Sequence, residues 1–515
     1  MRLGEWARRR AARESSGTAI DDFLAGASTT DVVAKRGLPL AAAEGIRSFY
    51  ELIDRGPRVC SGTSCRFAPG SNALCERLAT LVGGEMAQVR CLGHCYAAPA
   101  FMSGKRVFAH GVEIAPEAWI ESWGEGAELH EDVVAIPRRS LAPTPVILRN
   151  LVHAEPAQHA AWDVRGRLHE YQLPQGSEIL DAIERTRLRG RGGAAFPTAA
   201  KWRAARDTAA RERCVVANGD EGDPGSYVDR LLLEEDPHAV LAGVVACART
   251  IGAGRAYIYI RAEYPRAREV VERAVRSAHS AGCLEGIDVQ VTSGAGSYVC
   301  GEETALLNSM EGLRGAPRIK PPYPAESGLW GMPTVVQNIE TLAAVPWIAR
   351  TGRPAGTKVV CVAGAVARPC AVEMELGTTL RRVLVEGAGG PASDRGWKMA
   401  LVGGPLGRVL PEHLFDAPLD YDALPGFGHG GVVVFDHSVT VRALAEHLFE
   451  FGRAESCGSC APCRIGTARL ADLRDRASLE RLLETLELGS LCGFGPGVAR
   501  PIRDLLQHFG EEVFP

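Results

Sequence analysis

Cysteine spacing constrains this chain more than any other feature of its sequence. Of fifteen cysteines, eight fall into two tight groups: Cys60, Cys65, Cys91 and Cys95, and Cys457, Cys460, Cys463 and Cys492. The other seven are scattered, most of them among apolar or small residues, and are interpreted as small buried hydrophobes. The two groups therefore predict two metal centres built on thiolates.

The C-terminal group favours a [4Fe–4S] cubane. Two residues separate Cys457 from Cys460 and Cys460 from Cys463, whereas Cys492 is remote. Such a loop points successive sulfurs at one centre, and the distant fourth thiolate closes the site. Structural zinc is the alternative, but zinc favours paired C-x2-C knuckles.

The N-terminal group supplies two ligand pairs, Cys60 with Cys65 and Cys91 with Cys95. Two pairs suit a [2Fe–2S] rhomb, in which each pair holds one iron. Zinc is again the alternative, although neither spacing is the tight C-x2-C of a zinc knuckle.

Composition indicates a globular protein of several domains. At 515 residues, and with about 150 residues per domain, we expect three or four domains. The chain has 58 basic and 62 acidic residues, a net charge of −4, which gives no reason to expect a nucleic acid partner. No apolar run approaches the roughly 20 residues of a membrane helix, so we expect no direct membrane insertion.

The first residues are basic but lack the apolar stretch of a secretory signal, which predicts a cytoplasmic protein. A mitochondrial transit peptide is the alternative, which Glu5 and Glu14 disfavour, and a solvated helical arm is the preferred interpretation. Because the cytoplasm keeps thiols reduced, disulfides do not explain the cysteine groups.

Periodicity predicts an α/β multidomain protein that begins with a helical segment, residues 1–55. Residues 56–128 combine the first cysteine group with a helix over 71–81, a strand over 86–91 and a hairpin over 101–108. Prolines mark residues 129–155 as an extended linker.

The rest of the chain predicts three further domains. In 156–350, strands alternate with long helices, which indicates a parallel sheet covered by helices; the strands are 214–217, 256–260 and 288–292. Residues 355–436 contain an apolar hairpin and a helix over 378–386, and predict a small β-grasp-like domain. Residues 437–515 predict a helical bundle that contains the second cysteine group.

Glycine-rich and acidic segments of the 156–350 domain suit ligand binding. The loop LRGRGGAAFPTAAKW follows a helix rather than a strand, which disfavours a standard dinucleotide fingerprint. Its backbone N–H groups can still bind a phosphate, with charge from Arg189, Arg191 and Lys201, although a plain turn is the alternative.

The segment NGDEGDPG lies at the carboxyl end of a strand, where open sheets bind ligands; calcium is disfavoured because EF-hand spacing is absent. In SGAGSYVCGEE, Glu302 and Glu303 open a helix, where the helix dipole alone would favour carboxylates.

Over roughly residues 170–515 the chain resembles the flavin- and NADH-binding subunit of respiratory complex I and its soluble diaphorase relatives. The segments that carry this resemblance are, in order, GRGGAAFPTAAKW, NGDEGDPGSY, YIYIRAEYP, GSYVCGEETALLNSMEG, PRIKPPYPAESGLWGMPTVVQNIETL and ESCGSCAPCRIG. The first 130 residues, with RVCSGTSC and VRCLGHCYAAPA, resemble the thioredoxin-like [2Fe–2S] subunit of the same complexes, fused in front. The resemblance implies a thioredoxin-like ferredoxin domain followed by a Rossmann-like domain that binds FMN and NAD(H).

The resemblance also assigns site residues. Positions that match FMN contacts are Gly190, Arg191, Gly192, Lys201, Asn218, Asp220, Glu221, Gly301, Glu302, Gln337 and Asn338. Positions that match NADH contacts are Phe196, Asp223, Tyr298 and Glu303, and the second cysteine group matches the [4Fe–4S] ligands. The chain departs from the family at Ala195, usually glycine, at Gln337, usually asparagine, and at Asp223, often glutamate. The gap from Cys463 to Cys492 is also shorter than in the family.

The implied activity is exchange of a hydride between NAD(H) and FMN, followed by release of single electrons to iron–sulfur clusters. No side-chain acid or base is needed, so we expect no catalytic residue in that sense. The CAPCRIG run is most similar to the beta subunit of NAD-dependent formate dehydrogenase, which implies a large molybdenum- or tungsten-type partner with its own clusters. Alternatives are the diaphorase subunit of an NAD-coupled hydrogenase, a fused complex I flavoprotein, and a zinc-bearing scaffold without flavin.

Overall fold

The computed structural model describes residues 17–53, 56–84, 86–104, 106–109, 135–152, 161–472 and 475–513. They belong to two compact units that do not follow the order of the sequence. Unit 1 comprises Met1–Asp54, Ala157–Glu221 and Asp229–Ala355, and unit 2 comprises Arg55–Pro156, Gly222–Val228 and Gly356–Pro515.

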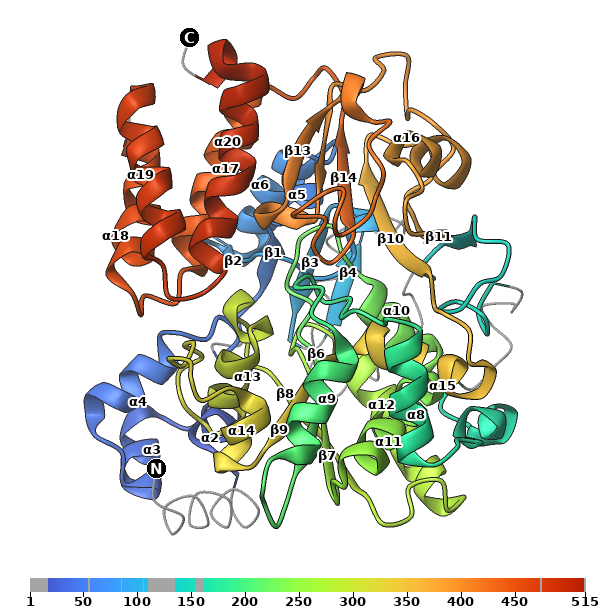
Figure 1. Ribbon diagram of the computed structural model, residues 1–515. Coiled ribbons are helices and arrows are strands. Elements are labelled where there is room, and N and C mark those ends of the chain that lie inside the picture. Colours follow the sequence, from blue (N-terminus) through green and yellow to red (C-terminus); the bar gives the residue numbers. More distant parts are fainter. Residues whose placement is uncertain are drawn as a thin grey trace. The chain divides into compact units, whose positions relative to one another are not determined.

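Unit 1 is built on a parallel sheet in the order β8-β7-β6-β9 (Figure 1). Its strands are β6 (Cys214–Gly219), β7 (Arg255–Ile260), β8 (Asp288–Ser293) and β9 (Thr334–Asn338). The chain runs from β6 through β7 to β8 and then returns to the opposite side of β6 as β9. The strand order therefore reverses between β6 and β9, the place where open α/β sheets bind ligands at the carboxyl ends of their strands. The predicted parallel sheet is confirmed.

Apolar residues at alternate positions of this sheet give it two buried faces. Val216, Tyr257 and Val336 pack on one face with Leu306 and Trp330. The unit's helices are α8 (Gly176–Arg185), α9 (Thr198–Asp207), α10 (Val228–Glu235), α11 (Pro237–Ile251), α12 (Pro265–Ser280), α13 (Glu303–Met310), α14 (Pro324–Ser327) and α15 (Ile339–Thr351). A sheet covered by helices in this way holds its strand ends rigidly, which suits a binding site.

The N-terminal segment is helical, as predicted, but it belongs to unit 1 rather than forming a separate lead-in. Its helices are α2 (Ala19–Leu24), α3 (Thr29–Arg36) and α4 (Leu40–Arg47), and capping boxes begin α2 and α3. Ile20, Phe23 and Tyr50 share one apolar core with Ala295 and Cys300. The predicted helical arm over residues 1–16 lies outside the described residues.

The first cysteine group lies in unit 2, in a region built on a four-stranded sheet of order β2-β1-β3-β4. The elements are β1 (Arg58–Cys60), α5 (Thr63–Arg66), α6 (Ser71–Val82), β2 (Ala87–Val89), β3 (Ala100–Ser103) and β4 (Arg106–Ala109). The predicted helix, strand and hairpin are all present. Residue Lys105, within the predicted hairpin over 101–108, and residues 110–134 lie outside the described part.

The predicted linker is partly wrong. Within residues 135–152, β5 (Arg138–Ser140) pairs in parallel with β11 (Cys370–Glu375) as the edge of a six-stranded sheet. The buried carboxylate of Glu373 accepts hydrogen bonds from the backbone N–H groups of Val146, Ile147 and Leu148 at 2.7, 2.9 and 2.8 Å. These residues are therefore fixed in a domain, because their polar backbone groups are satisfied there.

The remaining strands of this sheet are β10 (Thr357–Gly364), β12 (Met399–Val402), β13 (Arg408–Pro411) and β14 (Gly431–Phe435). The predicted apolar hairpin is confirmed as β10 and β11. The predicted helix over 378–386 begins two residues later than expected, with Thr379 as N-cap of α16 (Leu380–Arg382), and continues as a π-helical turn (Val383–Gly387).

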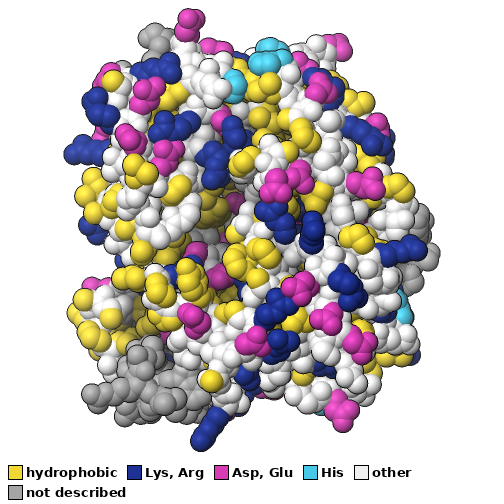
Figure 2. Space-filling model, viewed as in Figure 1, with side chains coloured by type: hydrophobic (Ala, Val, Ile, Leu, Met, Phe, Trp, Pro, Cys, Tyr) yellow, Lys and Arg dark blue, Asp and Glu magenta, His cyan; other side chains and the backbone are white. Residues whose placement is uncertain are grey.

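The end of unit 2 is the predicted helical bundle. Its helices are α17 (Val441–Glu455), α18 (Ala461–Arg469), α19 (Arg476–Gly489) and α20 (Phe494–Val513). None of the helices in the described part of the chain is long and apolar enough to cross a membrane. On the face seen in Figure 2, basic and acidic side chains are interspersed rather than gathered by sign.

Candidate functional site

Three predicted segments meet at the carboxyl ends of the unit 1 strands, and Asn218 joins two of them. The Asn218 Nδ2 donates to the carbonyl of Gly301 at 2.9 Å, and its Oδ1 accepts from the backbone N–H of Asp220 at 3.1 Å. A Cβ on Gly301 would lie 3.2 Å from the carbonyl oxygen of Asp220. The amide of Asn218 therefore fixes the loop after β6 against the loop after β8.

The glycine-rich loop lies against the end of β9. The Gly190 N–H closes the loop on the carbonyl of Phe196 at 2.9 Å, and the Arg191 N–H donates to Thr341 Oγ1 at 2.9 Å. A Cβ on Gly192 would lie 3.0 Å from the Cβ of Asn338. A side chain at Gly192 would therefore be tightly packed against Asn338, which favours glycine at this position.

Basic side chains of the loop contact protein groups rather than projecting freely. The Arg191 guanidinium is buried, donates to the carbonyl of Ala355 at 2.5 Å and lies 3.8 Å from Glu340. The Lys201 ammonium forms an ion pair with Glu303 and donates to the carbonyl of Val336 at 3.0 Å. In this structure the expected positive charge of the loop is therefore largely balanced within unit 1.

Ala195 and Phe196 have unusual environments. Ala195 has a φ of 50°, a left-handed conformation that glycine adopts without steric cost. This explains physically why the family prefers glycine at this position. The next side chain, Phe196, is 52% exposed, and the Lys201 ammonium lies 6.0 Å from its ring centroid. An exposed aromatic ring next to a backbone loop is suited to stack on a planar ligand.

The segment after β8 forms a short 3-10 helix (Tyr298–Gly301) that leads into α13. Glu302 is the N-cap of α13, and its Oε2 accepts from the N–H groups of Thr304 and Ala305, each at 2.9 Å. Its other oxygen accepts from Lys320 at 2.7 Å. Burial opposes ionisation of Glu302, but hydrogen bonds with Lys320 and Thr304 outweigh it and hold its pKa below the ordinary value. The Glu302 carboxylate therefore has a structural role in capping this helix.

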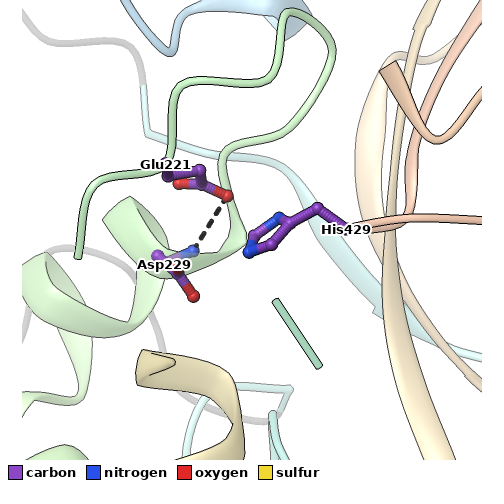
Figure 3. Close-up of side chains that lie close together, drawn as sticks. All are labelled: Glu221, Asp229 and His429. Carbon is purple, nitrogen blue, oxygen red and sulfur yellow. Dashed lines mark hydrogen bonds between the residues drawn. The ribbon is translucent and has the colours of Figure 1, made fainter. Parts of the chain in front are cut away.

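Glu221 is buried and turned toward α10 (Figure 3). Its Oε1 accepts from the Asp229 N–H at 3.2 Å, and its Oε2 accepts from the Arg230 N–H at 3.0 Å and from the Tyr264 hydroxyl at 3.2 Å. The carboxylate thus satisfies donors at the start of a helix, where negative charge is stabilised. The Glu221 side chain, predicted as a flavin contact, therefore already has partners within the protein.

The last strand supplies Gln337 and Asn338. Gln337 is buried and accepts from the Trp202 indole N–H at 3.3 Å. Asn338 is the N-cap of α15, and its Nδ2 donates to Asp229 Oδ2 at 2.7 Å. The substitution of glutamine for the family's asparagine at 337 is therefore accommodated by an indole partner.

One predicted residue lies in the other unit. Asp223 belongs to the Gly222–Val228 segment of unit 2, where a Cβ on Gly404 would lie 3.1 Å from its Oδ1. The other fourteen predicted FMN and NADH residues are all in unit 1.

Sequence reasoning missed four polar residues around this site: Asp229, Lys320, Glu340 and Thr341. Each contacts a predicted site residue as described above. Lys320, Glu340 and Thr341 lie in the matched segment PRIKPPYPAESGLWGMPTVVQNIETL, whereas Asp229 lies outside every matched segment. The hydrogen bonds that join Asp229 to Asn338 and Thr341 to Arg191 span 109 and 150 residues, beyond the range of periodicity.

The geometry fits a phosphate-bearing planar cofactor. The buried hydroxyl of Thr198, at the start of α9, has no hydrogen-bond partner among the described residues. A Cβ on Gly190 would meet no atom closer than 3.6 Å, so protein packing does not by itself require glycine there. Both observations suit a ligand that approaches the backbone of this loop.

The first cysteine group converges in the interior of unit 2. All four thiols are buried, and the Cys91 and Cys95 sulfurs lie 3.7 Å apart. Hydrogen bonding to the thiols of Cys65 and Cys91, together with burial, raises the pKa of Cys60. Backbone N–H groups of Gly93 and Gly225 donate to Cys91 and Cys95 at 3.3 and 3.2 Å. Buried thiolates need a cation for their stabilisation, so this donor set fits a metal centre.

The second group gathers between helices of the bundle. Cys457 follows α17, Cys460 is the N-cap of α18, Cys463 lies in α18, and Cys492 precedes α20. Burial raises the pKa of Cys463 to about 12, and the other three thiols are close enough to raise it electrostatically. The backbone N–H of Leu491 donates to Cys460 Sγ at 3.5 Å. Despite the shorter gap, the Cys492 thiol is therefore near enough to Cys463 to affect it electrostatically, as a shared metal centre would require.

Known family models match the region of the predicted flavin site and the region of the second cysteine group. Residues 183–347 match the Nuo51 FMN-binding domain, and residues 443–514 match the NADH-ubiquinone oxidoreductase-F iron-sulfur binding region. Residues 359–410 match the SLBB domain, within the predicted β-grasp-like region. The FMN-binding match contains all fifteen predicted FMN and NADH positions.

Curated relatives settle the family. An NADH-quinone oxidoreductase subunit of Rhizobium meliloti is 37% identical over 72% of this chain and 96% of its own length. NADH dehydrogenase [ubiquinone] flavoprotein 1 of Dictyostelium discoideum is 39% identical over 65% of this chain and 78% of its own length. NADP-reducing hydrogenase subunit HndC of Solidesulfovibrio fructosivorans is 39% identical over 65% of this chain and 75% of its own length. The chain belongs to the family of NADH dehydrogenase flavoprotein subunits. It therefore has an FMN-binding domain and a [4Fe–4S]-binding region.

Similarity to solved structures covers nearly the whole chain. A chain of NAD+-reducing [NiFe]-hydrogenase in the air-oxidized state superimposes with a TM-score of 0.82 and 32% identity, over 94% of this chain and 90% of the other. The H2-reduced state gives a TM-score of 0.81 and 31% identity, over 99% of this chain and 92% of the other. The mixed α/β fold is thus shared with a chain of NAD+-reducing [NiFe]-hydrogenase.

Proposed function

We propose that the chain is the diaphorase subunit of a multi-subunit oxidoreductase, in which it exchanges a hydride between NAD(H) and FMN. The observation that carries this proposal is the meeting of three loops at the β6/β9 strand ends, within the FMN-binding match. FMN, when bound, supplies the conversion of two-electron nicotinamide chemistry into single-electron steps. The chain's own residues would bind FMN and NAD(H) and orient them toward each other.

Each loop has a distinct task in this proposal. Gly190 and Gly192 keep the backbone of the loop open to a phosphate, and Asn218 holds Asp220 and Gly301 in register. Phe196 offers an exposed ring face to a planar group. Glu303 accepts hydroxyl hydrogen bonds from the nucleotide and fixes the ammonium of Lys201. Tyr298 lies in the 3-10 helix that precedes both carboxylates.

The second cysteine group holds the [4Fe–4S] cluster and passes electrons out of the chain. We assign a [2Fe–2S] cluster to the first group, supported by four buried thiols and by N–H donors to two sulfurs. Zinc is the competing ligand for both groups, and iron analysis with EPR of the reduced protein separates the two.

The partner subunit decides the second substrate. The CAPCRIG run supports a formate dehydrogenase with a large molybdenum- or tungsten-type subunit. An NAD-coupled hydrogenase is at least as well supported, because NAD+-reducing [NiFe]-hydrogenase supplies the superimposed chains and a hydrogenase subunit is among the relatives. We place the complex in the cytoplasm. Co-purification from the native host, with metal analysis for molybdenum, tungsten or nickel, distinguishes the two partners.

A direct test uses the purified chain alone. It should oxidise NADH with ferricyanide, because the residues that would hold FMN and NADH are present in one polypeptide. Acid extraction should release FMN in near-equimolar amount. Recovery of FAD, or of no flavin from active protein, would overturn the proposal.

A further inference from the structure

The loop before Tyr298 is attached to the N-terminal segment, residues 17–53, by two backbone hydrogen bonds. The Glu51 N–H donates to the carbonyl of Gly296, and the Leu52 N–H donates to the carbonyl of Ala295, each at 3.0 Å. Gly296 has a φ of 84°, and a Cβ there would lie 2.9 Å from Leu52 Cγ. The loop therefore adopts its conformation in direct contact with the N-terminal segment.

The turn after α13 is attached to the same segment. The Tyr50 hydroxyl donates to the carbonyl of Leu313 at 2.7 Å, and the Arg314 guanidinium lies 4.8 Å from the Phe49 ring centroid. A Cβ on Gly312 would lie 2.7 Å from the Cβ of Thr18. The segment that carries Glu302 and Glu303 thus contacts residues 17–53 both before the 3-10 helix and after α13.

Tyr50 links these two attachments. Its side chain is only 3% exposed and shares the apolar core that contains Ala295 and Cys300. A buried hydroxyl with one strong acceptor fixes the ring, and the ring in turn supports the loop that begins the 3-10 helix. No residue of the segment belongs to the predicted FMN or NADH set, so its effect on the site is indirect.

We infer that residues 17–53 are a positioning element for the nucleotide-binding element Gly294–Glu303, with Tyr50 as the positioning residue. Loops lose conformational freedom when they bind a ligand, and a loop already fixed by its surroundings loses less. The N-terminal segment therefore raises affinity for the nucleotide without touching it. This inference rests on the proposed NADH site and deepens it.

The test is Tyr50→Phe in the full-length protein, which removes one hydroxyl and retains the ring. We expect the KM for NADH in the ferricyanide assay to rise at least threefold, while kcat changes less than twofold and FMN content stays unchanged. The matched control is Tyr171→Phe, which removes a tyrosine hydroxyl that bonds His238 at 2.9 Å elsewhere in unit 1. The control should leave the KM within 1.5-fold of the wild type.

Hydrogen exchange provides a second readout that needs no activity. In Tyr50→Phe, peptides over 294–303 should exchange at least threefold faster, whereas peptides from β6 and α11 should not change. Equal KM values in the two variants, or exchange that rises uniformly over unit 1, would overturn the inference. Wild-type protein that binds no FMN or does not oxidise NADH would instead overturn the proposed function, and the exchange result would then decide the positioning role alone.

Discussion

Lys201 and Glu303 form an ion pair across unit 1, although the resemblance assigns the lysine to FMN and the glutamate to NADH. The side chains are 17% and 34% exposed, so solvent screens the pair and its contribution to stability is about 0–1 kcal/mol. The pair therefore links a residue assigned to FMN with one assigned to NADH, and its contribution to the stability of the fold is small. Its importance should appear in binding rather than in stability.

Replacing Glu303 by glutamine tests this relationship. We expect the KM for NADH to rise at least fivefold with FMN still bound, because an amide accepts hydroxyl hydrogen bonds less strongly than a carboxylate and no longer pairs with Lys201. The control is Glu272→Gln, which breaks an exposed ion pair with Arg268 on α12 and should change nothing. A KM within about twofold, less than ~0.4 kcal/mol, would remove Glu303 from the site.

Gly190→Ala separates ligand contact from protein packing. The new Cβ would meet no protein atom closer than 3.6 Å, so the thermal midpoint of the FMN-free protein should stay within about 1 °C of the wild type. FMN affinity should fall at least tenfold, because the methyl group occupies space that the cofactor needs. The comparison is Gly243→Ala, whose Cβ would lie 2.1 Å from the carbonyl oxygen of Leu342 and should destabilise the protein itself. Unchanged FMN affinity in Gly190→Ala would mean that this loop does not hold the flavin.

Ala195→Gly should stabilise the protein. The left-handed backbone at this residue costs an alanine about 1–2 kcal/mol, and the greater freedom of glycine in the unfolded chain offsets about 0.5–1 kcal/mol of the gain. A rise in the thermal midpoint, measured by calorimetry, is therefore expected. Ala194→Gly is the control, because Ala194 is not among the positive-φ residues and its replacement should lower the midpoint. A lower midpoint in both variants would show that the strain at Ala195 is relieved elsewhere.

The sequence was informative wherever a local pattern decides the structure. Alternation and helical periodicity gave the parallel sheet, the bundle and the β10–β11 hairpin, because these depend on the period of apolar residues. Prolines near β5 suggested a linker. The sequence could not show that β5 is a strand, because its partner strand and the Glu373 carboxylate are more than 200 residues away. The capping role of Glu221 was likewise hidden, because a cluster of acidic residues after a strand has no local signal that distinguishes a ligand contact from a helix cap.

Cys463→Ser should separate the flavin reaction from electron delivery. Cys463 is buried, with the other three thiols close by, so its loss should remove or alter the [4Fe–4S] signal in EPR. Dye reduction directly from the flavin should survive, whereas activity that depends on the partner subunit should fall at least tenfold. Cys247→Ser is the control, since this buried cysteine lies in α11 of unit 1 outside both groups. Coupled activity that survives with the cubane lost would mean that electrons leave the chain by another route.

Cys91→Ser tests what the N-terminal cysteine group contributes to turnover. Its sulfur lies 3.7 Å from that of Cys95 and accepts the N–H of Gly93, so the serine variant should lose the [2Fe–2S] EPR signal and retain FMN and the [4Fe–4S] signal. The resemblance to complex I, where the matching cluster lies on the far side of the flavin from the main chain of clusters, predicts a side branch that holds one electron. Coupled activity with the native partner should then fall by less than about threefold. If the cluster were an essential electron carrier, the variant would lose nearly all coupled activity. That result, in protein with full FMN and [4Fe–4S] content, would contradict the side-branch prediction. Unchanged EPR in Cys91→Ser would refute the [2Fe–2S] assignment itself, because replacing one thiolate ligand by a serine oxygen changes the signal even where the cluster is retained.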